Sequence, residues 1–255
     1  MLLSGLLLAG CIGAYEPGEG ATAPIVAADH PCADVEPGPW TGHPLASAEL
    51  TTSTPSEDAG LQALFDAMPA EGDTVSVDLT IDGAVVSNVG FGGADGSQPP
   101  LWFEDASGGV RTFDVPNLVA YQPGDRLAFR VTELTNYFGE LEITQMSDIT
   151  IVDTGAPVPV RSAGDQVVRY PEQRGQNVEF AGLYLGDASD DCGDNACLEI
   201  DNGLVVQTLD LRGAYPETLV AGETCLHVIS PVEVTRGDVR LGATNFAWMR
   251  TYDSQ

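Results

Sequence analysis

The sequence predicts a mainly β protein made of two tandem small β-barrel domains and one short helix. Short runs of alternating apolar and polar residues recur from residue 74 onward, and Gly or Pro bounds most of them. Helical periodicity is scarce. The order of the strand patterns in the first half recurs in the second half, which indicates two copies of one β domain. At 255 residues and 43% apolar, the chain can bury a core in each copy.

The helix is expected in the stretch TPSEDAGLQALFDAMP, residues 54–69. Thr54 suits the N-cap and Glu57 completes a capping box. Apolar residues then recur at helical spacing, and Pro69 ends the pattern. These residues are Leu61, Leu64, Phe65 and Met68. Such a stripe predicts packing against the core rather than a cofactor site.

Strands are expected from TVSVDLTIDG at residue 74 through DITIVD, which ends at residue 153. Apolar residues alternate with polar ones in the first of these stretches, as in a half-buried strand. Gly108-Gly109 predicts one hairpin turn, and Pro123-Gly124-Asp125 predicts another turn.

The repeat is visible when the two halves are aligned. LWFEDASGGVRTFDV, from Leu101, lines up with CLEIDNGLVVQTLDL, from Cys197. Further on, Gly124 falls opposite Gly222 and Gly139 opposite Gly237. The pattern and the turn residues agree although few side chains are identical. We therefore expect the same strand order in both halves.

This order resembles the OB-fold, a five-stranded Greek-key barrel. Residues 121–155, YQPGDRLAFRVTELTNYFGELEITQMSDITIVDTG, are similar to the second half of OB-type domains in exported bacterial proteins. Some of those proteins carry a nuclease or phosphatase domain beside the barrel. The sequence contains no such catalytic domain, so the resemblance implies the module without the activity. The alternative fold is a pair of immunoglobulin-like sandwiches, which would need about seven strands each.

The N-terminus has a pattern typical of export. Residues 2–10 are almost all apolar or small, a run far shorter than the ~20 residues that span a bilayer. Leu8-Ala9-Gly10-Cys11 resembles the lipobox of bacterial lipoproteins, in which the signal is removed and the Cys is acylated. The resemblance implies lipidation of Cys11 and a lipid-anchored protein of the bacterial cell envelope, at the outer membrane or the cell surface. The run lacks the usual positive charge, which indicates that the true start lies upstream.

These patterns divide the chain into four parts. We expect a signal peptide over residues 1–10 and a flexible acidic spacer over residues 11–50. A first OB-like domain with the helix follows over residues 51–157, and a second OB-like domain over residues 158–255.

Four cysteines remain after Cys11, and an even number in an exported chain predicts disulfides. These are Cys32, Cys192, Cys197 and Cys225. Three pairings are possible. A bridge from Cys192 to Cys197 would span a hairpin, and it would leave Cys32 and Cys225 to pin the spacer to the second barrel.

An acidic loop, GDASDDCGDNAC, is the one candidate metal site. Its carboxylates belong to Asp187, Asp190, Asp191 and Asp194. Calcium takes six to eight oxygen ligands, but the spacing matches no standard calcium loop, and we prefer a solvated polar loop as the explanation. We expect no cofactor and no specific stabilisation by Ca²⁺.

Charge and motifs indicate a binding or structural role without catalysis. The net charge is −28, and Trp102, Phe103 and Arg111 stand among acidic residues, so we expect no nucleic-acid partner. The chain contains no HExxH, GxSxG, GxGxxG or Walker pattern. Of its three histidines, only His227 lies outside the spacer. The membrane, through the lipid, and a protein or glycan of the envelope are the expected partners.

Two alternatives remain open. One alternative is an accessory subunit of an exported hydrolase or nuclease. The other is a carbohydrate-binding module. An exposed row of Trp and Tyr on one barrel face would favour sugar binding. A shallow uncharged surface would favour a protein partner.

Overall fold

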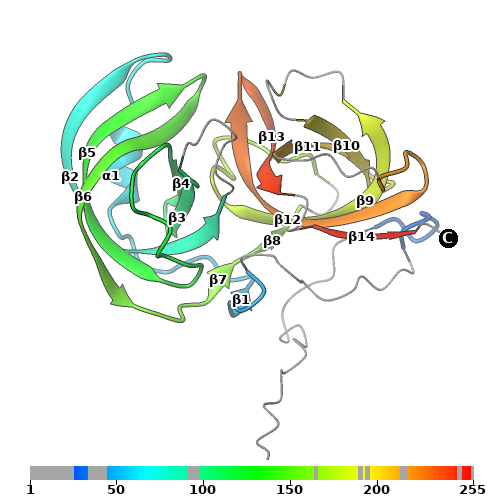
Figure 1. Ribbon diagram of the computed structural model, residues 1–255, viewed down its shortest axis with the longest axis horizontal. Helices are drawn as coiled ribbons and strands as arrows, with labels where there is room; N and C mark the ends of the chain where they lie inside the picture. The colour runs from blue at the N-terminus through cyan, green and yellow to red at the C-terminus, as the bar shows by residue number, and fades with distance from the viewer. Residues whose placement is uncertain are drawn as a thin grey trace, which may run out of the picture.

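The computed structural model describes residues 26–33, 45–90, 98–163, 166–188, 192, 196–212, 218–245 and 249–253. In this part of the chain, strands dominate and one short helix is present (Figure 1). The elements are β1 (Leu50–Thr51), α1 (Leu61–Asp66), β2 (Thr74–Val89), β3 (Leu101–Asp105), β4 (Gly108–Thr112), β5 (Arg126–Tyr137), β6 (Glu140–Asp153), β7 (Val158–Pro159), β8 (Arg161–Ser162), β9 (Asn177–Asp187), β10 (Ala196–Asp201), β11 (Val206–Arg212), β12 (Thr224–Thr235), β13 (Asp238–Asn245) and β14 (Arg250–Asp253).

The first half forms a closed barrel with the strand order β2-β3-β4-β6-β5. The pairs are antiparallel except for β4 and β6, which run parallel. The expected alternation holds in the outer part of β2, and the strand then continues to Val89 with buried residues on both faces. Apolar side chains fill the barrel, among them Ile81, Phe103, Phe129 and Leu134.

The second half repeats this arrangement. Strands β9, β10, β11, β13 and β12 pair in the same order, again with one parallel pair, β11 and β13. Pairing of β12 with β9 closes the barrel, and β8 and β14 extend its sheet. Phe180, Ile200, Leu209 and Leu241 belong to its core.

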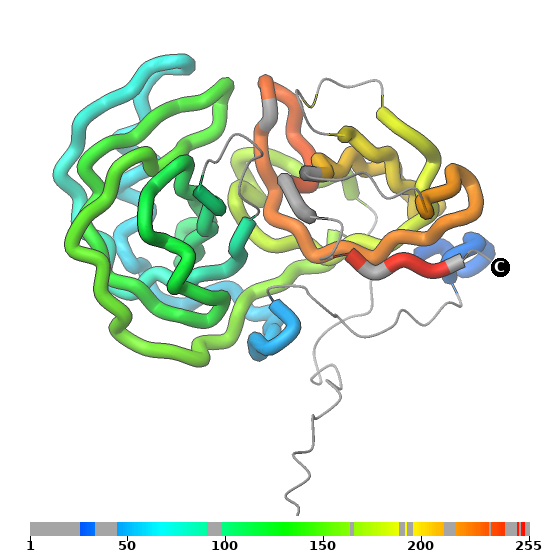
Figure 2. The backbone as a smooth tube through the Cα atoms, in the orientation of Figure 1, coloured from blue at the N-terminus to red at the C-terminus, as the bar shows by residue number. Residues whose placement is uncertain are grey.

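The fold is therefore mainly β, with two tandem OB-like barrels and one short helix, as the sequence predicted. Corresponding strands occupy corresponding places, and the two barrels lie side by side (Figures 1 and 2). Each barrel closes on five strands rather than forming two packed sheets, which excludes the immunoglobulin-like alternative.

The helix starts later than the capping residues predicted. Helix α1 begins at Leu61, after Gly60 with a φ of 104°, and no side chain at the N-cap bonds to it. Asp105 takes that role from a distance, because its Oδ2 accepts hydrogen bonds from the backbone N–H groups of Ala59 (2.9 Å) and Leu61 (3.0 Å). A buried carboxylate from β3, rather than a local capping box at Thr54 and Glu57, thus satisfies N–H groups at the start of the helix.

The predicted turn at Gly108-Gly109 is also displaced. The β3–β4 turn consists of Ala106 and Ser107, and both glycines belong to β4. Gly109 lies where the two barrels touch: a Cβ on it would come within 2.5 Å of the backbone of Gly175. The glycine is required there by the close approach of two backbones and not by a turn.

The N-terminal segment, residues 26–33, is attached to the second barrel. Ala27 donates a backbone hydrogen bond to Asn202 (2.9 Å), and Cys32 is joined to Cys225 of β12. Strand β1 pairs in parallel with β7 between the barrels. The expected signal peptide and Cys11 lie outside the described residues. In the described part of the chain, no helix has the length and apolarity needed to cross a membrane.

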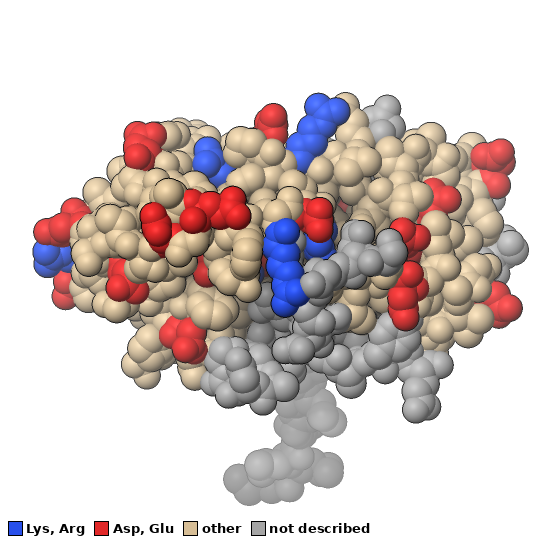
Figure 3. Space-filling view, turned by 90° about the horizontal axis from the view of Figure 1, so that it is seen from above, with Lys and Arg blue, Asp and Glu red and all other residues tan. Residues whose placement is uncertain are grey.

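Acidic side chains are spread over the surface. Figure 3 shows Asp and Glu scattered across both barrels on one face, with fewer Arg side chains among them. All ten basic residues of the chain are Arg. This distribution gives the surface a negative field that attracts cations.

Candidate functional site

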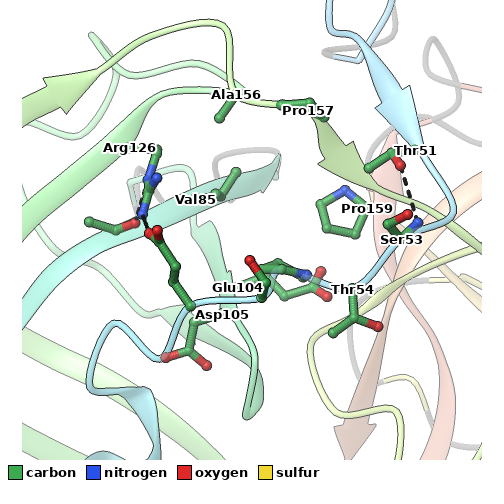
Figure 4. A pocket seen from close by; sticks show the side chains of 14 residues that line it. Thr51, Ser53, Thr54, Val85, Glu104, Asp105, Arg126, Ala156, Pro157 and Pro159 are labelled. Atoms are coloured by element: carbon green, nitrogen blue, oxygen red, sulfur yellow. Dashed lines mark hydrogen bonds and ion pairs between the residues drawn. The ribbon is translucent and has the colours of Figure 1, made fainter.

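A cleft of about 300 Å³ lies beside the first barrel, next to the β1–β7 pair (Figure 4). The segment from Thr51 to Glu57 forms one wall, and residues 156–159 form part of the other. Strands β2, β3 and β5 supply Val85, Glu104 and Arg126. Figure 4 shows Glu104 between Arg126 on one side and the Thr51–Thr54 segment on the other.

Glu104 is the most unusual residue of the cleft, because its side chain is 0% exposed. Its Oε1 forms an ion pair with Nη2 of Arg161 at 2.5 Å. Arg161 belongs to β8, so the second sheet supplies the cation for an acid of the first barrel. In the described part of the chain, neither Oε2 of Glu104 nor Nη1 of Arg161 has a hydrogen-bond partner. Oε2 of Glu104 can thus still accept a hydrogen bond, and Nη1 of Arg161 can still donate one.

Burial raises the pKa of Glu104 to about 7, although Arg161 acts in the opposite direction. The desolvated carboxylate loses more from leaving water than it recovers from one ion pair. The neighbouring charge of Asp105 raises the pKa a little further. Glu104 therefore changes its charge near neutral pH, where an ordinary carboxyl is fully ionised.

Asp105 stands next to Glu104 but has a structural role. Its Oδ2 holds the start of α1, as described above, and its Oδ1 accepts hydrogen bonds from the N–H (2.7 Å) and the hydroxyl (2.5 Å) of Ser107. Both oxygens are occupied. Of the two adjacent buried acids, Glu104 is the one that can respond to a ligand.

The rim of the cleft is polar and exposed. Arg126 donates to Glu57 through Nη2 (2.5 Å) and to the carbonyl of Gly83 through Nε (3.0 Å). The side chains of Arg126 and Glu57 are 30% and 69% exposed, so this pair adds little stability. The lining includes four hydroxyl residues, Thr51, Ser53, Thr54 and Ser56, and no histidine or cysteine among the described residues. The arrangement offers hydrogen bonds and charge rather than an activated nucleophile.

A buried ionic cluster joins the two barrels. Arg111 of β4 contacts Glu140 (3.1 Å) and Glu142 of β6, and Glu233 of β12 in the second barrel (3.2 Å). All four side chains are at most 5% exposed. The three carboxylates hold the pKa of Arg111 well above its usual range, against the effect of burial. Burial and the charge of Glu140 also raise the pKa of Tyr170 to about 12.

Hydrogen bonds between uncharged groups complete the junction. Asn88 of β2 donates to the side-chain oxygen of Asn177 in β9 (2.8 Å), and Asn177 donates to the carbonyl of Ser87 (2.7 Å). Gly109 donates to the carbonyl of Arg174 (2.9 Å). Because these contacts are buried and join both barrels, Arg161 is held at a fixed place relative to Glu104.

The structure places the four predicted disulfide cysteines and one residue of the predicted acidic metal site. The structure contains the disulfides Cys32–Cys225 and Cys192–Cys197, one of the three possible pairings. Asp187 is exposed and accepts a hydrogen bond from the Tyr184 hydroxyl (3.0 Å). The other acids of the loop, Asp190, Asp191 and Asp194, lie outside the described residues. Within the described residues, no group of three or more His, Cys, Asp or Glu side chains could hold a metal ion.

In the part of the chain that the structure describes, Trp and Tyr side chains form no exposed row of the kind that would favour sugar binding. Trp102 is 0% exposed and lies opposite Arg111 in the β3–β4 pair. Tyr137 and Phe138 are exposed and pack edge to face, with ring centroids 4.8 Å apart, where β5 meets β6. His227 is buried and its Nε2 lies 2.7 Å from Glu179.

Neither Glu104 nor Arg161 was predicted from the sequence to be a site residue. A signal for Glu104 was present in LWFED, where three consecutive apolar residues indicate a strand buried on both faces. The acids that follow in such a strand are expected to be buried as well, and all five residues of β3 are. No local pattern marks Arg161, because it meets Glu104 through the packing of the two halves.

Comparisons with known proteins give only distant likenesses. No known protein family matches the sequence, and no curated protein does. Among solved structures, the tetrameric p202 HIN2 domain is similar at a TM-score of 0.36 and 11% identity, over 72% of this chain and 95% of that one. The Ifi202 HINa domain in complex with 20-bp double-stranded DNA gives 0.35 and 11%, over 72% and 100%. A murine DNA-binding protein bound to double-stranded DNA gives 0.34 and 9%, over 72% and 99%.

These comparisons contradict the expectation that nucleic acid is not a partner. Two of the three structures named above are complexes with double-stranded DNA, so that exclusion is withdrawn. At TM-scores below 0.5 the same likenesses do not assign a DNA ligand to this chain.

Proposed function

We propose that the protein is a lipid-anchored binding protein of the bacterial cell envelope, without catalysis of its own. The lipobox-like residues 8–11 and the even number of cysteines after Cys11 support export and anchoring. The two joined barrels serve as a rigid scaffold, and the cleft beside the first barrel is the binding site.

The buried Glu104 carboxyl at this cleft carries the proposal. Ionising it inside the protein is unfavourable, as its raised pKa shows, and a positive charge that enters the cleft relieves part of that cost. Among the lining residues, Glu57, Glu104 and Asp105 outnumber the single cation, Arg126. The four hydroxyl residues can accept hydrogen bonds from an N–H group. We therefore assign the cleft to a ligand that carries a primary ammonium or guanidinium group.

Binding of a matched pair of small probes tests this assignment. Nα-acetyl-lysine N-methylamide should perturb the backbone amide signals of residues 51–57 and 104–105 in NMR spectra of the protein, with a Kd of about 1 mM, roughly −4 kcal/mol. The norleucine analogue has the same four-carbon chain without the ammonium group and should not bind. Affinity should be several-fold higher at pH 8 than at pH 5.5, because Glu104 is ionised only at the higher pH.

Two controls separate the cleft from general attraction to an acidic protein. Glu104→Gln should abolish the pH dependence of binding, whereas Asp78→Asn, on an exposed part of β2, should leave it unchanged. Equal binding of both probes, or unchanged binding to Glu104→Gln, would show that the cleft does not recognise a cation through Glu104.

Membrane attachment is tested separately in a bacterial host that acylates lipoproteins. The wild-type chain, expressed with a complete signal sequence, should partition into the detergent phase of a Triton X-114 extract. Cys11→Ser should move it to the aqueous phase. A Cys11→Ser protein that still enters the detergent phase would contradict the lipid anchor.

A further inference from the structure

The disulfide between Cys192 and Cys197 lies against a buried cation. Nη1 of Arg240 is 2.5 Å from Sγ of Cys192 and 3.1 Å from Sγ of Cys197. Arg240 belongs to β13 and is 0% exposed, whereas each cysteine is 5% exposed. Nη2 of Arg240 lies 3.3 Å from the exposed carboxylate of Asp238. The buried guanidinium is thus directed at both sulfur atoms.

This contact favours the reduced form of the pair over the disulfide. A disulfide sulfur is a weak hydrogen-bond acceptor, whereas a thiolate carries a full negative charge and forms a charge-assisted hydrogen bond with a guanidinium. Cysteines beside arginine therefore exist more readily as thiolates. Arg240 stabilises the product of reduction more than the starting disulfide, and this makes the bond easier to reduce.

The surroundings distinguish the two sulfur atoms. Cys192 is the nearer to Arg240, and Cys197 lies directly opposite the buried acid Asp210 in the β10–β11 pair. The cation favours a thiolate at Cys192, the nearer of the two sulfur atoms. Cys192 is accordingly the better leaving group.

The second disulfide has a different environment. Cys32 and Cys225 are 2% and 0% exposed, and their bond joins residues 193 positions apart. Cys225 lies in β12, paired on one side with β9 and on the other with β14. In the described part of the chain, no arginine donates a hydrogen bond to either of its sulfur atoms. This bond has the features of a structural disulfide.

We propose that Cys192–Cys197 is a redox-active disulfide that is cleaved by an exported dithiol reductant, with Arg240 as the positioning residue. A thiolate of the reductant attacks Sγ of Cys197, the Cys192–Cys197 bond breaks, and Cys192 leaves as a thiolate beside Arg240. The second thiol of the reductant then attacks the mixed disulfide. Cys197 leaves with a proton, the reductant becomes a disulfide, and two electrons have passed to the protein. Of the two protons of the dithiol, one is released to solvent when the attacking thiolate forms, and the other is the proton with which Cys197 leaves. Cys192 remains a thiolate.

Equilibration of the full chain with mixtures of reduced and oxidised dithiothreitol tests this proposal. Free thiols are alkylated at each ratio and located by peptide mass spectrometry. Cys192 and Cys197 should become reduced at a dithiothreitol ratio at least tenfold less reducing than the ratio that opens Cys32–Cys225. A tenfold ratio corresponds to about 30 mV for a two-electron couple. If both disulfides open together, or Cys32–Cys225 opens first, the proposal is wrong.

Variants of Arg240 identify the cause. Arg240→Gln should make Cys192–Cys197 at least tenfold harder to reduce, while Arg240→Lys, which keeps a cation, should recover part of the difference. Arg130→Gln is the matched control, because Arg130 forms an exposed ion pair with Asp78 in the first barrel. An unchanged midpoint in a folded Arg240→Gln protein would refute the role of Arg240. If that variant does not fold, as judged by circular dichroism, the comparison of the two wild-type disulfides decides.

Discussion

Replacement of Glu104 by Gln should change the pH dependence of stability. The pKa of Glu104 is about 7 in the native protein, against 4.5 as the ordinary value. Each tenfold change in proton affinity corresponds to about 1.4 kcal/mol. The protonated carboxyl therefore contributes stability that is fully present below pH 4.5 and is lost as pH rises through 7, a loss of about 3 kcal/mol. A Gln side chain has the same shape and does not ionise.

The measurement is the free energy of unfolding from urea titrations of both proteins between pH 5 and pH 8.5. The difference between Glu104→Gln and the wild type should grow in favour of the variant by roughly 2.5 kcal/mol over this range. A constant offset between the two curves reflects the amide itself. The test depends only on how the difference between the two free energies of unfolding changes with pH. Carboxyl ¹³C shifts of Glu104 should titrate near pH 7.

Replacing Arg161 tests the direction in which its charge shifts the pKa of Glu104. Its charge lowers the pKa of Glu104, so Arg161→Met should move the ¹³C titration to higher pH. Parallel stability curves for the wild type and Glu104→Gln, or a Glu104 titration near pH 4.5, would refute the reasoning that burial governs this carboxyl.

Two further predictions concern the junction of the barrels. Arg111→Met should lower the free energy of unfolding by about 3–5 kcal/mol in urea titrations, because three buried carboxylates lose their shared cation; a loss below 1 kcal/mol would contradict this. Gly109→Ala should lower the thermal midpoint well beyond the effect of Gly222→Ala. Its new Cβ would meet the backbone of Gly175 at 2.5 Å, whereas Gly222, with a φ of 79°, faces open space. Equal effects would show that the contact between Gly109 and Gly175 costs no more than the backbone strain of an alanine at position 222.

The fold class was accessible from the sequence because it depends on local patterns. Alternation of apolar and polar residues fixes which face of a strand is buried, and turn residues fix where strands end. Since both features recur in the two halves, the repeated barrel followed from them. The start of the helix did not, because Thr54 and Glu57 satisfy a local capping rule while the carboxylate that caps α1 comes from β3. Gly108-Gly109 likewise fits a turn locally. In the fold, however, Gly109 lies in β4, where the close approach of the Gly175 backbone leaves no room for a side chain.

The sequence by itself determined the mainly β class, the doubled unit, the acidic surface and the even set of cysteines. Tertiary structure decided which charges are buried and what faces them. Glu104 and Arg161 are 57 residues apart, and Arg111 and Glu233 are 122 residues apart, so no local pattern relates them. The pKa of Glu104 depends on desolvation, and desolvation exists only once the two barrels close around the side chain. The same holds for Arg240, whose place against Cys192 and Cys197 arises from the closure of the second barrel.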